Sequence, residues 1–269
     1  HWNHPRFFAY FPANNSGPSI LGELLAAGLG VNGMLWQTSP AATELEEKVM
    51  SWLGQLVGVP DDFRGVIQDT ASTATLCALI CAREKMTGHG VNEKGVGGLA
   101  DGSALRVYTS REAHSSVIKG ARVAGIGAEN VVLVDIDDKR AMDPADLTAC
   151  IEADRAAGHT PCAVVATVGT TGCTAIDPLT EIGLVARANN LWLHVDAALA
   201  GSAAILPEKR WIFDGLEQAD SLVFNPHKWM FTNFDCSAYY VKDPDHLERT
   251  MAIQPEYLKT GRDREVTNF

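Results

Sequence analysis

The chain has 269 residues, 46% of them hydrophobic and 20% charged, which is the composition of a globular protein with a substantial core. Its formal net charge of −11 would repel nucleic acid and anionic membrane surfaces, so neither is an expected partner. No apolar run reaches the ~18 residues of a membrane span, and the first residues lack the charged and apolar regions of a secretory signal.

The cysteines and histidines form no pattern typical of a metal site. Cys77 and Cys81 lie four residues apart on an apolar stretch, and the other cysteines are scattered without a CxxC pair. His194 and Asp196 have no third candidate ligand nearby in the sequence, and neither do the two histidines among the first four residues. We therefore expect no metal, and buried, reduced thiols that indicate a cytoplasmic protein.

The first part of the chain is predicted to be mainly helical. Residues 39–58 open with serine and proline and then place apolar side chains at the spacing of one helix face. Residues 70–88 form a second helical segment, which ends at Gly88. The glycine-rich residues 88–103 are expected to be a surface loop rather than a domain linker, because the apolar segments on both sides need each other as partners.

From Leu105 onward, short strands and helices are predicted to alternate. Helices are expected over residues 143–158, which begin with Asp-Pro, and over residues 177–190, with Asp177 as the cap and Pro178 at the first helical position. The strands are continuous apolar runs, as in a parallel sheet that is buried on both faces. They comprise residues 105–109, 131–135, 163–168, 191–196, 221–225 and 237–241. The pattern predicts an α/β fold, with helices flanking a mostly parallel sheet.

Polar residues follow these strands at the points where the strands end. In open α/β sheets, ligands bind beyond the carboxyl ends of the strands. The segment Thr70, Ala71 and Ser72 opens a helix, whose free amides and dipole favour an anion such as phosphate. Small residues, among them Ala198, follow one strand and leave room for a bulky ligand. The other candidate groups at the strand ends are His114, Thr171, Asp196, Asn225, His227 and Lys228.

One lysine, one buried carboxylate, one histidine and a phosphate cradle point to pyridoxal 5'-phosphate as the cofactor. A lysine in a desolvated pocket has a lowered pKa and can condense with the aldehyde of this cofactor. A carboxylate facing the pyridine nitrogen keeps that nitrogen protonated, so that the ring accepts electrons from a bond broken at the substrate. An imidazole can stack on the ring.

Several motifs, in this order, resemble the group II pyridoxal-phosphate decarboxylases, and among them most closely the aromatic-L-amino-acid decarboxylases. The motifs are FFAYFPANNS (7–16), SPAATELE (39–46), QDTASTATL (68–76), AHSS (113–116), VATVGTTGCTAID (165–177), HVDAALAGSA (194–203), NPHKW (225–229) and NFDCSAYYVK (233–242). The resemblance extends over essentially the whole chain. It implies the fold-type I architecture, with residues 1–16 as a linking segment that contributes to the substrate pocket and residues 17–269 as the cofactor-binding large domain. It also implies that the family's N-terminal helical segment and C-terminal small domain are absent from this chain.

The resemblance also implies a role for each matching residue. Lys228 is then the lysine that binds the cofactor aldehyde, Asp196 pairs with the ring nitrogen, and His114 stacks on the ring near the substrate carboxylate. The other cofactor-binding residues are Thr70, Ala71, Ser72, Thr171, Ala198, Asn225 and His227, and the aromatic substrate pocket contains Trp2, Tyr10, Phe11 and Pro12. Residues near Asn32 and Met34 reach the neighbouring subunit's pocket, which implies a homodimer with shared active sites.

The resemblance implies decarboxylation of aromatic L-amino acids to arylalkylamines and carbon dioxide. Tyr257 matches a tyrosine that returns a proton to the substrate carbon, whereas family members with phenylalanine there tend to be aldehyde synthases. Ala13, Asn32 and Met34 depart from the family pattern and leave the preferred substrate open. The alternatives are an aromatic aldehyde synthase, a group II decarboxylase for glutamate or histidine, and a truncated, non-catalytic homologue.

Overall fold

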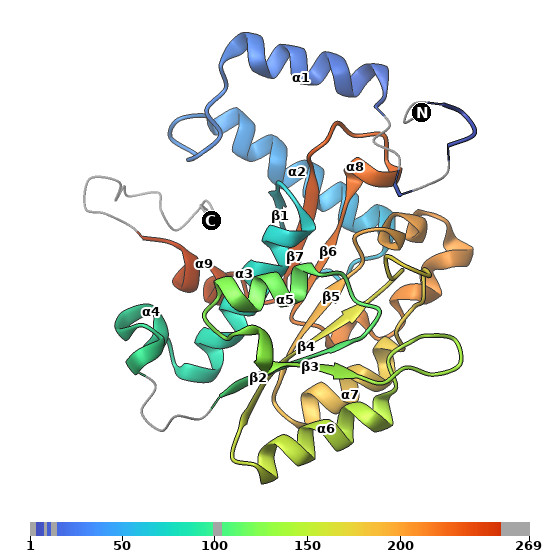
Figure 1. The fold of residues 1–269 in the computed structure, drawn as a ribbon. Helices are drawn as coiled ribbons and strands as arrows, with labels where there is room; N and C mark the ends of the chain where they lie inside the picture. Colours follow the sequence, from blue (N-terminus) through green and yellow to red (C-terminus); the bar gives the residue numbers. More distant parts are fainter. Residues whose placement is uncertain (1–3, 8–9, 12–14, 99–103, 254–269) are drawn as a thin grey trace.

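A computed structural model describes residues 4–7, 10–11, 15–98 and 104–253. Within these residues, seven strands form one sheet in the order β1-β7-β6-β5-β4-β2-β3 (Figure 1). Strand β7 is antiparallel to both of its neighbours, and the remaining pairs are parallel. The mostly parallel α/β sheet predicted from the apolar runs is therefore confirmed. The strands are β1 (Arg64–Gln68), β2 (Leu105–Ser110), β3 (Val131–Val134), β4 (Thr160–Thr167), β5 (Trp192–Asp196), β6 (Ser221–Phe224) and β7 (Ser237–Val241).

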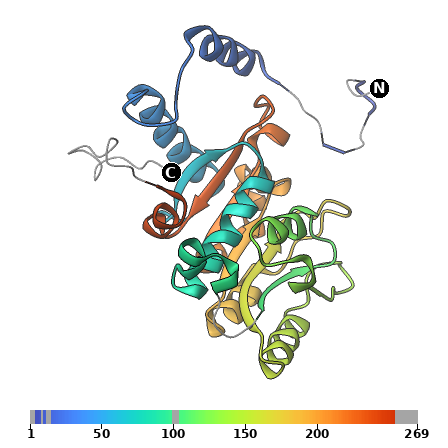
Figure 2. The ribbon, with the colours of Figure 1, turned by 60° about the vertical axis from the view of Figure 1, so that its left-hand side comes forward.

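Helices cover both faces of this sheet, as Figures 1 and 2 show. Helices α2, α6 and α7 pack on one face, and α3, α5 and α9 pack on the other, each layer closing its own apolar core. The α-helices are α1 (Gly17–Leu29), α2 (Pro40–Val57), α3 (Ala71–Thr87), α4 (Gly90–Lys94), α5 (Ser116–Val123), α6 (Pro144–Ala156), α7 (Leu179–Ala188), α8 (Pro226–Trp229) and α9 (Pro244–Met251). Short 3-10 helices are η1 (Val96–Gly98), η2 (Ala128–Asn130), η3 (Ala200–Ile205), η4 (Pro207–Phe213) and η5 (Leu216–Gln218).

The predicted helices exist, but three details differ from the prediction. Helix α7 begins at Leu179, and Asp177 does not cap it. Its buried carboxylate instead accepts the backbone N–H groups of Met142 (2.8 Å) and Thr167 (2.7 Å), and so joins the end of β4 to the loop after β3. The expected glycine-rich loop contains α4, and α1 lies in a region for which no helix was predicted. None of the helices in the described part of the chain is long and apolar enough to cross a membrane.

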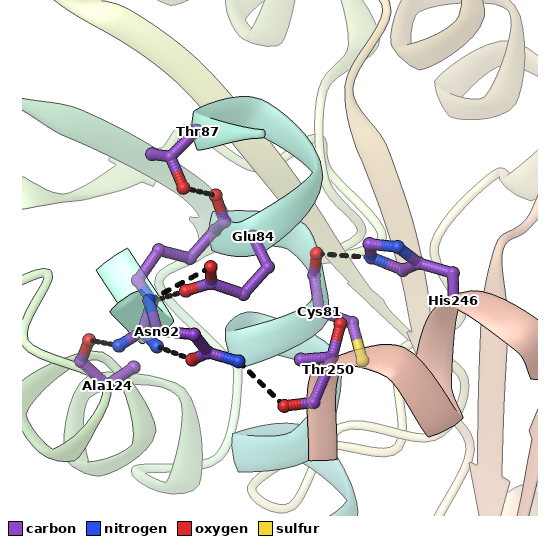
Figure 3. A network of polar contacts seen from close by, with 8 residues as sticks. Cys81, Glu84, Thr87, Asn92, Ala124, His246 and Thr250 are labelled. Carbon is purple, nitrogen blue, oxygen red and sulfur yellow. Dashed lines mark hydrogen bonds and ion pairs between the residues drawn. The ribbon is translucent and has the colours of Figure 1, made fainter. Parts of the chain in front are cut away.

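A partly buried polar network joins α3, α4 and α9 on one side of the sheet (Figure 3). Glu84 of α3 is fully buried, and its carboxylate accepts from Arg83 Nε (2.8 Å) and from the backbone N–H of Asn92 (3.2 Å). The Asn92 amide in turn donates to the carbonyl of Thr250 in α9 (2.7 Å), and His246 of α9 contacts the Cys81 carbonyl (2.8 Å). These contacts link the start of α9 to α3 through His246 and its last turn to α4 through Thr250.

Candidate active site

The predicted cofactor residues line one cavity of about 160 Å³ at the carboxyl ends of the parallel strands. Strands β4, β5 and β6, the start of α3 and the start of α8 all contribute to its walls. Its lining consists of Phe11, Thr70, Ala71, Ser72, His114, Thr167, Gly169, Thr171, Asp196, Ala198, Leu199, Asn225, His227, Lys228 and Phe234. Every predicted cofactor residue is in this set, although the segments that supply them are far apart in the sequence.

A larger cavity, of about 390 Å³, lies elsewhere, between α2 and β1. Glu46, Glu47, Asp61 and Arg64 are its charged lining residues, and no lysine or histidine lines it. It therefore lacks the nucleophile and the acid–base group that the smaller cavity contains, and we assign the chemistry to the smaller one.

Lys228 and Asp196 line the same cavity and influence each other electrostatically. Burial lowers the pKa of the Lys228 ammonium, and the nearby Asp196 carboxylate opposes this effect. Burial raises the pKa of Asp196, and the Ala198 backbone N–H, Lys228 and His114 all oppose that shift. The two side chains form no direct ion pair within 4.0 Å, so they act on each other across the cavity.

The Asp196 carboxylate is oriented by the turn that follows β5. Its side chain is only 4% exposed, and Oδ1 accepts the backbone N–H of Ala198 at 3.0 Å. Strand β5 pairs with β4 in a parallel register that places Thr167 directly beside Asp196. In such a register the two side chains point to the same face of the sheet, which agrees with their shared position in the cavity lining.

His227 and Asn225 are held by the start of β7. His227 Nδ1 accepts the backbone N–H of Cys236 at 2.9 Å, and Asn225 Oδ1 accepts from the Ser237 hydroxyl at 2.8 Å. His227 Nε2 lies 3.2 Å from Asn225 Nδ2, so both ring nitrogens face neighbouring polar groups. Burial, aided by the charge of Lys228, lowers the pKa of His227 and favours the neutral ring.

His114 lies at the junction between β2 and α5. Its Nδ1 accepts the backbone N–H of Ser116 at 3.2 Å, which fixes the ring orientation. Burial lowers its pKa, while the Asp196 carboxylate acts in the opposite direction. A neutral, oriented imidazole at this position can stack on a planar ligand and donate from Nε2.

The first turn of α3 has the features of an anion site. Thr70 caps the helix by accepting the backbone N–H of Thr73 at 3.3 Å, and no acidic residue occupies the first turn. The backbone amides of Ala71 and Ser72 lie in this turn. Free amides and the helix dipole at the start of a 17-residue helix favour a phosphate group there.

The residues present fit pyridoxal phosphate. The Thr167 hydroxyl is buried and has no hydrogen-bond partner in the described part of the chain, although Thr167 lines the cavity beside Asp196. A ligand that carries a polar group at its ring edge would satisfy it. Together with the buried amine, the carboxylate and the helix N-terminus, this hydroxyl matches the aldehyde, the pyridine ring and the phosphate of the cofactor.

An aromatic wall closes the side of the cavity near Lys228. The rings of His227 and Phe234 lie 4.5 Å apart between centroids, and Phe11 lies 6.0 Å from His227 and 6.2 Å from Phe234. Lys228 Nζ is 5.0 Å from the centroid of the Phe11 ring. Phe11 therefore lines the same cavity as the predicted cofactor residues.

Other residues of the predicted substrate pocket lie elsewhere or outside the described residues. The Tyr10 side chain is 82% exposed and does not line the cavity. Asn32 and Met34, which were predicted to reach the neighbouring subunit's pocket, are exposed and do not line this cavity. Trp2, Pro12 and Tyr257 lie outside the residues that the structure describes.

Four lining residues were missed in the sequence: Thr167, Gly169, Leu199 and Phe234. Thr167 is the last residue of β4 and Gly169 lies two residues beyond it, so the rule that ligands bind at strand ends could have included both. Phe234 lines the cavity because the turn after α8 brings it there, and nothing in the local sequence predicts the path of this turn.

Comparison with known proteins agrees with this geometry. Residues 1–268 match the pyridoxal-dependent decarboxylase conserved domain. The chain is 46% identical over 270 residues to phenylacetaldehyde synthase of Arabidopsis thaliana, covering 96% of this chain and 53% of that protein. It is 44% identical over 280 residues to aromatic-L-amino-acid decarboxylase of Cavia porcellus, covering 97% of this chain and 56% of the relative. It thus spans about half the length of these relatives.

The fold agrees as well. The crystal structure of Oryza sativa TDC with PLP and tryptamine superimposes with a TM-score of 0.93 at 39% identity, covering 100% of this chain and 56% of that one. The predicted fold-type I architecture is therefore confirmed. With a family domain matched from residue 1 to residue 268, the chain belongs to the pyridoxal-dependent decarboxylases.

Proposed function

We propose that this chain binds pyridoxal phosphate and forms the large domain of an enzyme that decarboxylates aromatic L-amino acids to arylalkylamines and carbon dioxide. Residues 1–16 then act as the linking segment and residues 17–269 as the cofactor-binding domain. The observation that carries the proposal is the single cavity in which Lys228, Asp196 and His114 meet the first turn of α3. Relatives named tryptophan and tyrosine decarboxylases, each 42% identical, support the aromatic substrate class.

Pyridoxal phosphate supplies an aldehyde that captures the substrate amine and a ring that accepts the electrons released when the carboxylate leaves. Lys228 supports this chemistry because burial lowers its pKa, so that more of the amine is unprotonated and nucleophilic at neutral pH. Asp196, oriented by the Ala198 N–H, holds a proton on the ring nitrogen. The first turn of α3 binds the phosphate through its amides.

His114 and the aromatic wall create the environment in which the substrate loses its charge. With the cofactor bound, the neutral His114 ring, oriented by the Ser116 N–H, would stack on it and could donate from Nε2 toward the substrate carboxylate. Phe11 and Phe234 exclude water from the side of the cavity near Lys228. A poorly hydrated carboxylate is destabilised relative to neutral carbon dioxide, which favours decarboxylation.

An aromatic aldehyde synthase is the second candidate function. The phenylacetaldehyde synthase of Arabidopsis thaliana, at 46% identity, is the specific observation that favours it. Tyr257 favours simple decarboxylation, because its phenol can return a proton to the substrate carbon. The two functions give different products: an amine, or an aldehyde with ammonia and peroxide.

We further propose that the protein is a cytoplasmic homodimer with shared active sites. Helix α1 has no buried residue, and its Leu24 and Leu25 side chains are 66% and 64% exposed. Trp52 of α2 is 56% exposed. Apolar surface of this kind is typical of a protein interface, and a second copy would bring Asn32 and Met34 near the neighbouring cavity. The free thiols of the cysteines fit a reducing compartment.

The test uses the full gene product with tryptophan, tyrosine, phenylalanine and their hydroxylated forms, and identifies the products by mass spectrometry. Amine release from at least one of these substrates is expected. In Lys228→Ala, turnover should fall by at least a thousandfold, and borohydride should no longer fix the cofactor to the protein. Lys209→Ala, at an exposed position, is the matched control and should behave like the wild type. Sustained turnover by Lys228→Ala would refute the assignment, and aldehyde with peroxide as the main product would establish the alternative.

A further inference from the structure

The turn between α8 and β7 carries Phe234 over the cavity. The Phe234 ring packs 4.5 Å from the His227 ring, yet 57% of its surface is exposed. Packing inside the cavity therefore covers less than half of this side chain, and its position depends on the backbone of its turn. In the same turn, Phe231 is 54% exposed and has a φ of +55°.

This turn is hydrogen-bonded to α1, which is more than two hundred residues away in the sequence. The Ser19 hydroxyl donates to Asn233 Oδ1 (2.9 Å) and accepts the Asn233 backbone N–H (2.8 Å). Asn233 Nδ2 donates to the Ser19 carbonyl (3.3 Å), and the Ser16 backbone N–H donates to the Phe231 carbonyl (3.0 Å). Asn233 is thus bound through its backbone and through both polar atoms of its side chain.

The Ser19 hydroxyl is the centre of this arrangement. Its single oxygen acts as donor and as acceptor toward one residue, as a hydroxyl can. Asn233 directly precedes Phe234, so a shift of Asn233 moves the aromatic ring. Since no residue of α1 is buried, the hydrogen bonds at its first turn are the specific link between this helix and the turn (Figure 1).

We propose that Ser19 and Asn233 are positioning residues that hold Phe234 against His227 and so shape the aromatic wall on which the side chain of the substrate rests. The proposal depends on the proposed function, because it assigns this wall to the binding of an aromatic amino acid. A contact with the substrate ring remote from the breaking bond contributes equally to the ground state and the transition state, so its loss raises KM and leaves kcat unchanged.

The experiment compares the full gene product with its Ser19→Ala, Ser19→Thr and Ser51→Ala variants, using the best aromatic substrate of the wild type. Ser19→Ala removes two hydrogen bonds, and we expect KM to rise about three- to tenfold with kcat within twofold of the wild type. Ser19→Thr keeps the hydroxyl and should restore KM. Ser51→Ala removes an exposed serine hydroxyl of α2 and should change neither constant. Cofactor absorbance per subunit should be equal in all four proteins.

An unchanged KM in Ser19→Ala would overturn the proposal, as would a loss of cofactor with kcat and KM changing together, because that would mark a general structural role. Failure of the proposed function gives a different result from failure of this positioning role. In the first case, the wild type itself releases no amine or aldehyde from any aromatic amino acid.

Discussion

His194 should make the stability of this domain fall steeply between pH 7 and pH 5. The residue lies on β5, two positions before Asp196, and is fully buried. Its Nδ1 is 2.9 Å from the Ser221 hydroxyl, which also accepts from Trp192 Nε1 at 3.0 Å. Nε2 has no hydrogen-bond partner among the described residues, and burial lowers the pKa of the ring from 6.5 to about 3.

The sign and size of the effect follow from this shift. The folded protein keeps His194 neutral, whereas the unfolded chain protonates it below pH 6.5. The stability associated with the neutral ring is therefore fully present above pH 6.5 and is lost as the pH falls toward 3. Between pH 7 and pH 5, proton uptake by the unfolded chain at this one residue lowers the free energy of unfolding by about 2 kcal/mol.

The assay is urea unfolding at pH 7 and pH 5 of the wild type and of His194→Asn, whose amide can still contact Ser221. The variant should lose about 1–3 kcal/mol at pH 7 because it leaves a cavity. Its further loss between pH 7 and pH 5 should be about 2 kcal/mol smaller than that of the wild type. His159→Asn, at a partly exposed histidine, is the control and should keep the pH dependence of the wild type. Equal losses in the wild type and His194→Asn would show that His194 is not the group that titrates.

Two further substitutions test the buried network and the tight turn at the cavity. Glu84→Ala leaves the basic partner of a buried ion pair uncompensated and should lower the free energy of unfolding by about 3–5 kcal/mol. The exposed Glu93→Ala should stay within about 0.5 kcal/mol of the wild type in the same urea titration, and equal effects would contradict the assignment of the network. Gly169→Ala would place a Cβ 2.6 Å from that of Ala200 at a φ of +85°, so spectroscopic titration should show at least tenfold weaker cofactor binding. Gly158→Ala has a similar φ of +83° but open space around it, and should bind the cofactor normally; equal weakening in both variants would indicate a general loss of stability instead.

The sheet and the central chemical groups could be predicted from the sequence because their signals are local. Strands β4 and β5 are mainly apolar, Asp196 is the last residue of β5, and Lys228 lies in α8, shortly after β6 ends. Parallel strands place their carboxyl ends at one edge of a sheet, so the topology alone brought these groups to one cavity. No knowledge of individual contacts was needed.

The features that could not be predicted depend on contacts between distant segments. Phe234 reaches the cavity because Asn233 is bound to Ser19, and neither residue type is itself a signal for an aromatic wall. Asp177 precedes a proline in the usual position of a helix cap, but two unpaired backbone N–H groups of neighbouring segments bind its carboxylate instead. The local sequence indicates which backbone groups a side chain can hydrogen-bond, whereas the tertiary fold determines which of these groups lie close to it.

Helix α3 connects the site to the rest of this layer of the fold. Its first turn carries the proposed phosphate site at Ala71, and its last turns carry Glu84, which the network binds to α4 and, through Asn92, to α9. At 1.5 Å per residue, these two positions are separated by about 20 Å along the helix axis. Groups this far apart, without shared partners, contribute almost additively to stability. Binding of the cofactor to the folded state would therefore add stability at one end of α3, while the network stabilises the other end whether or not the cofactor is bound.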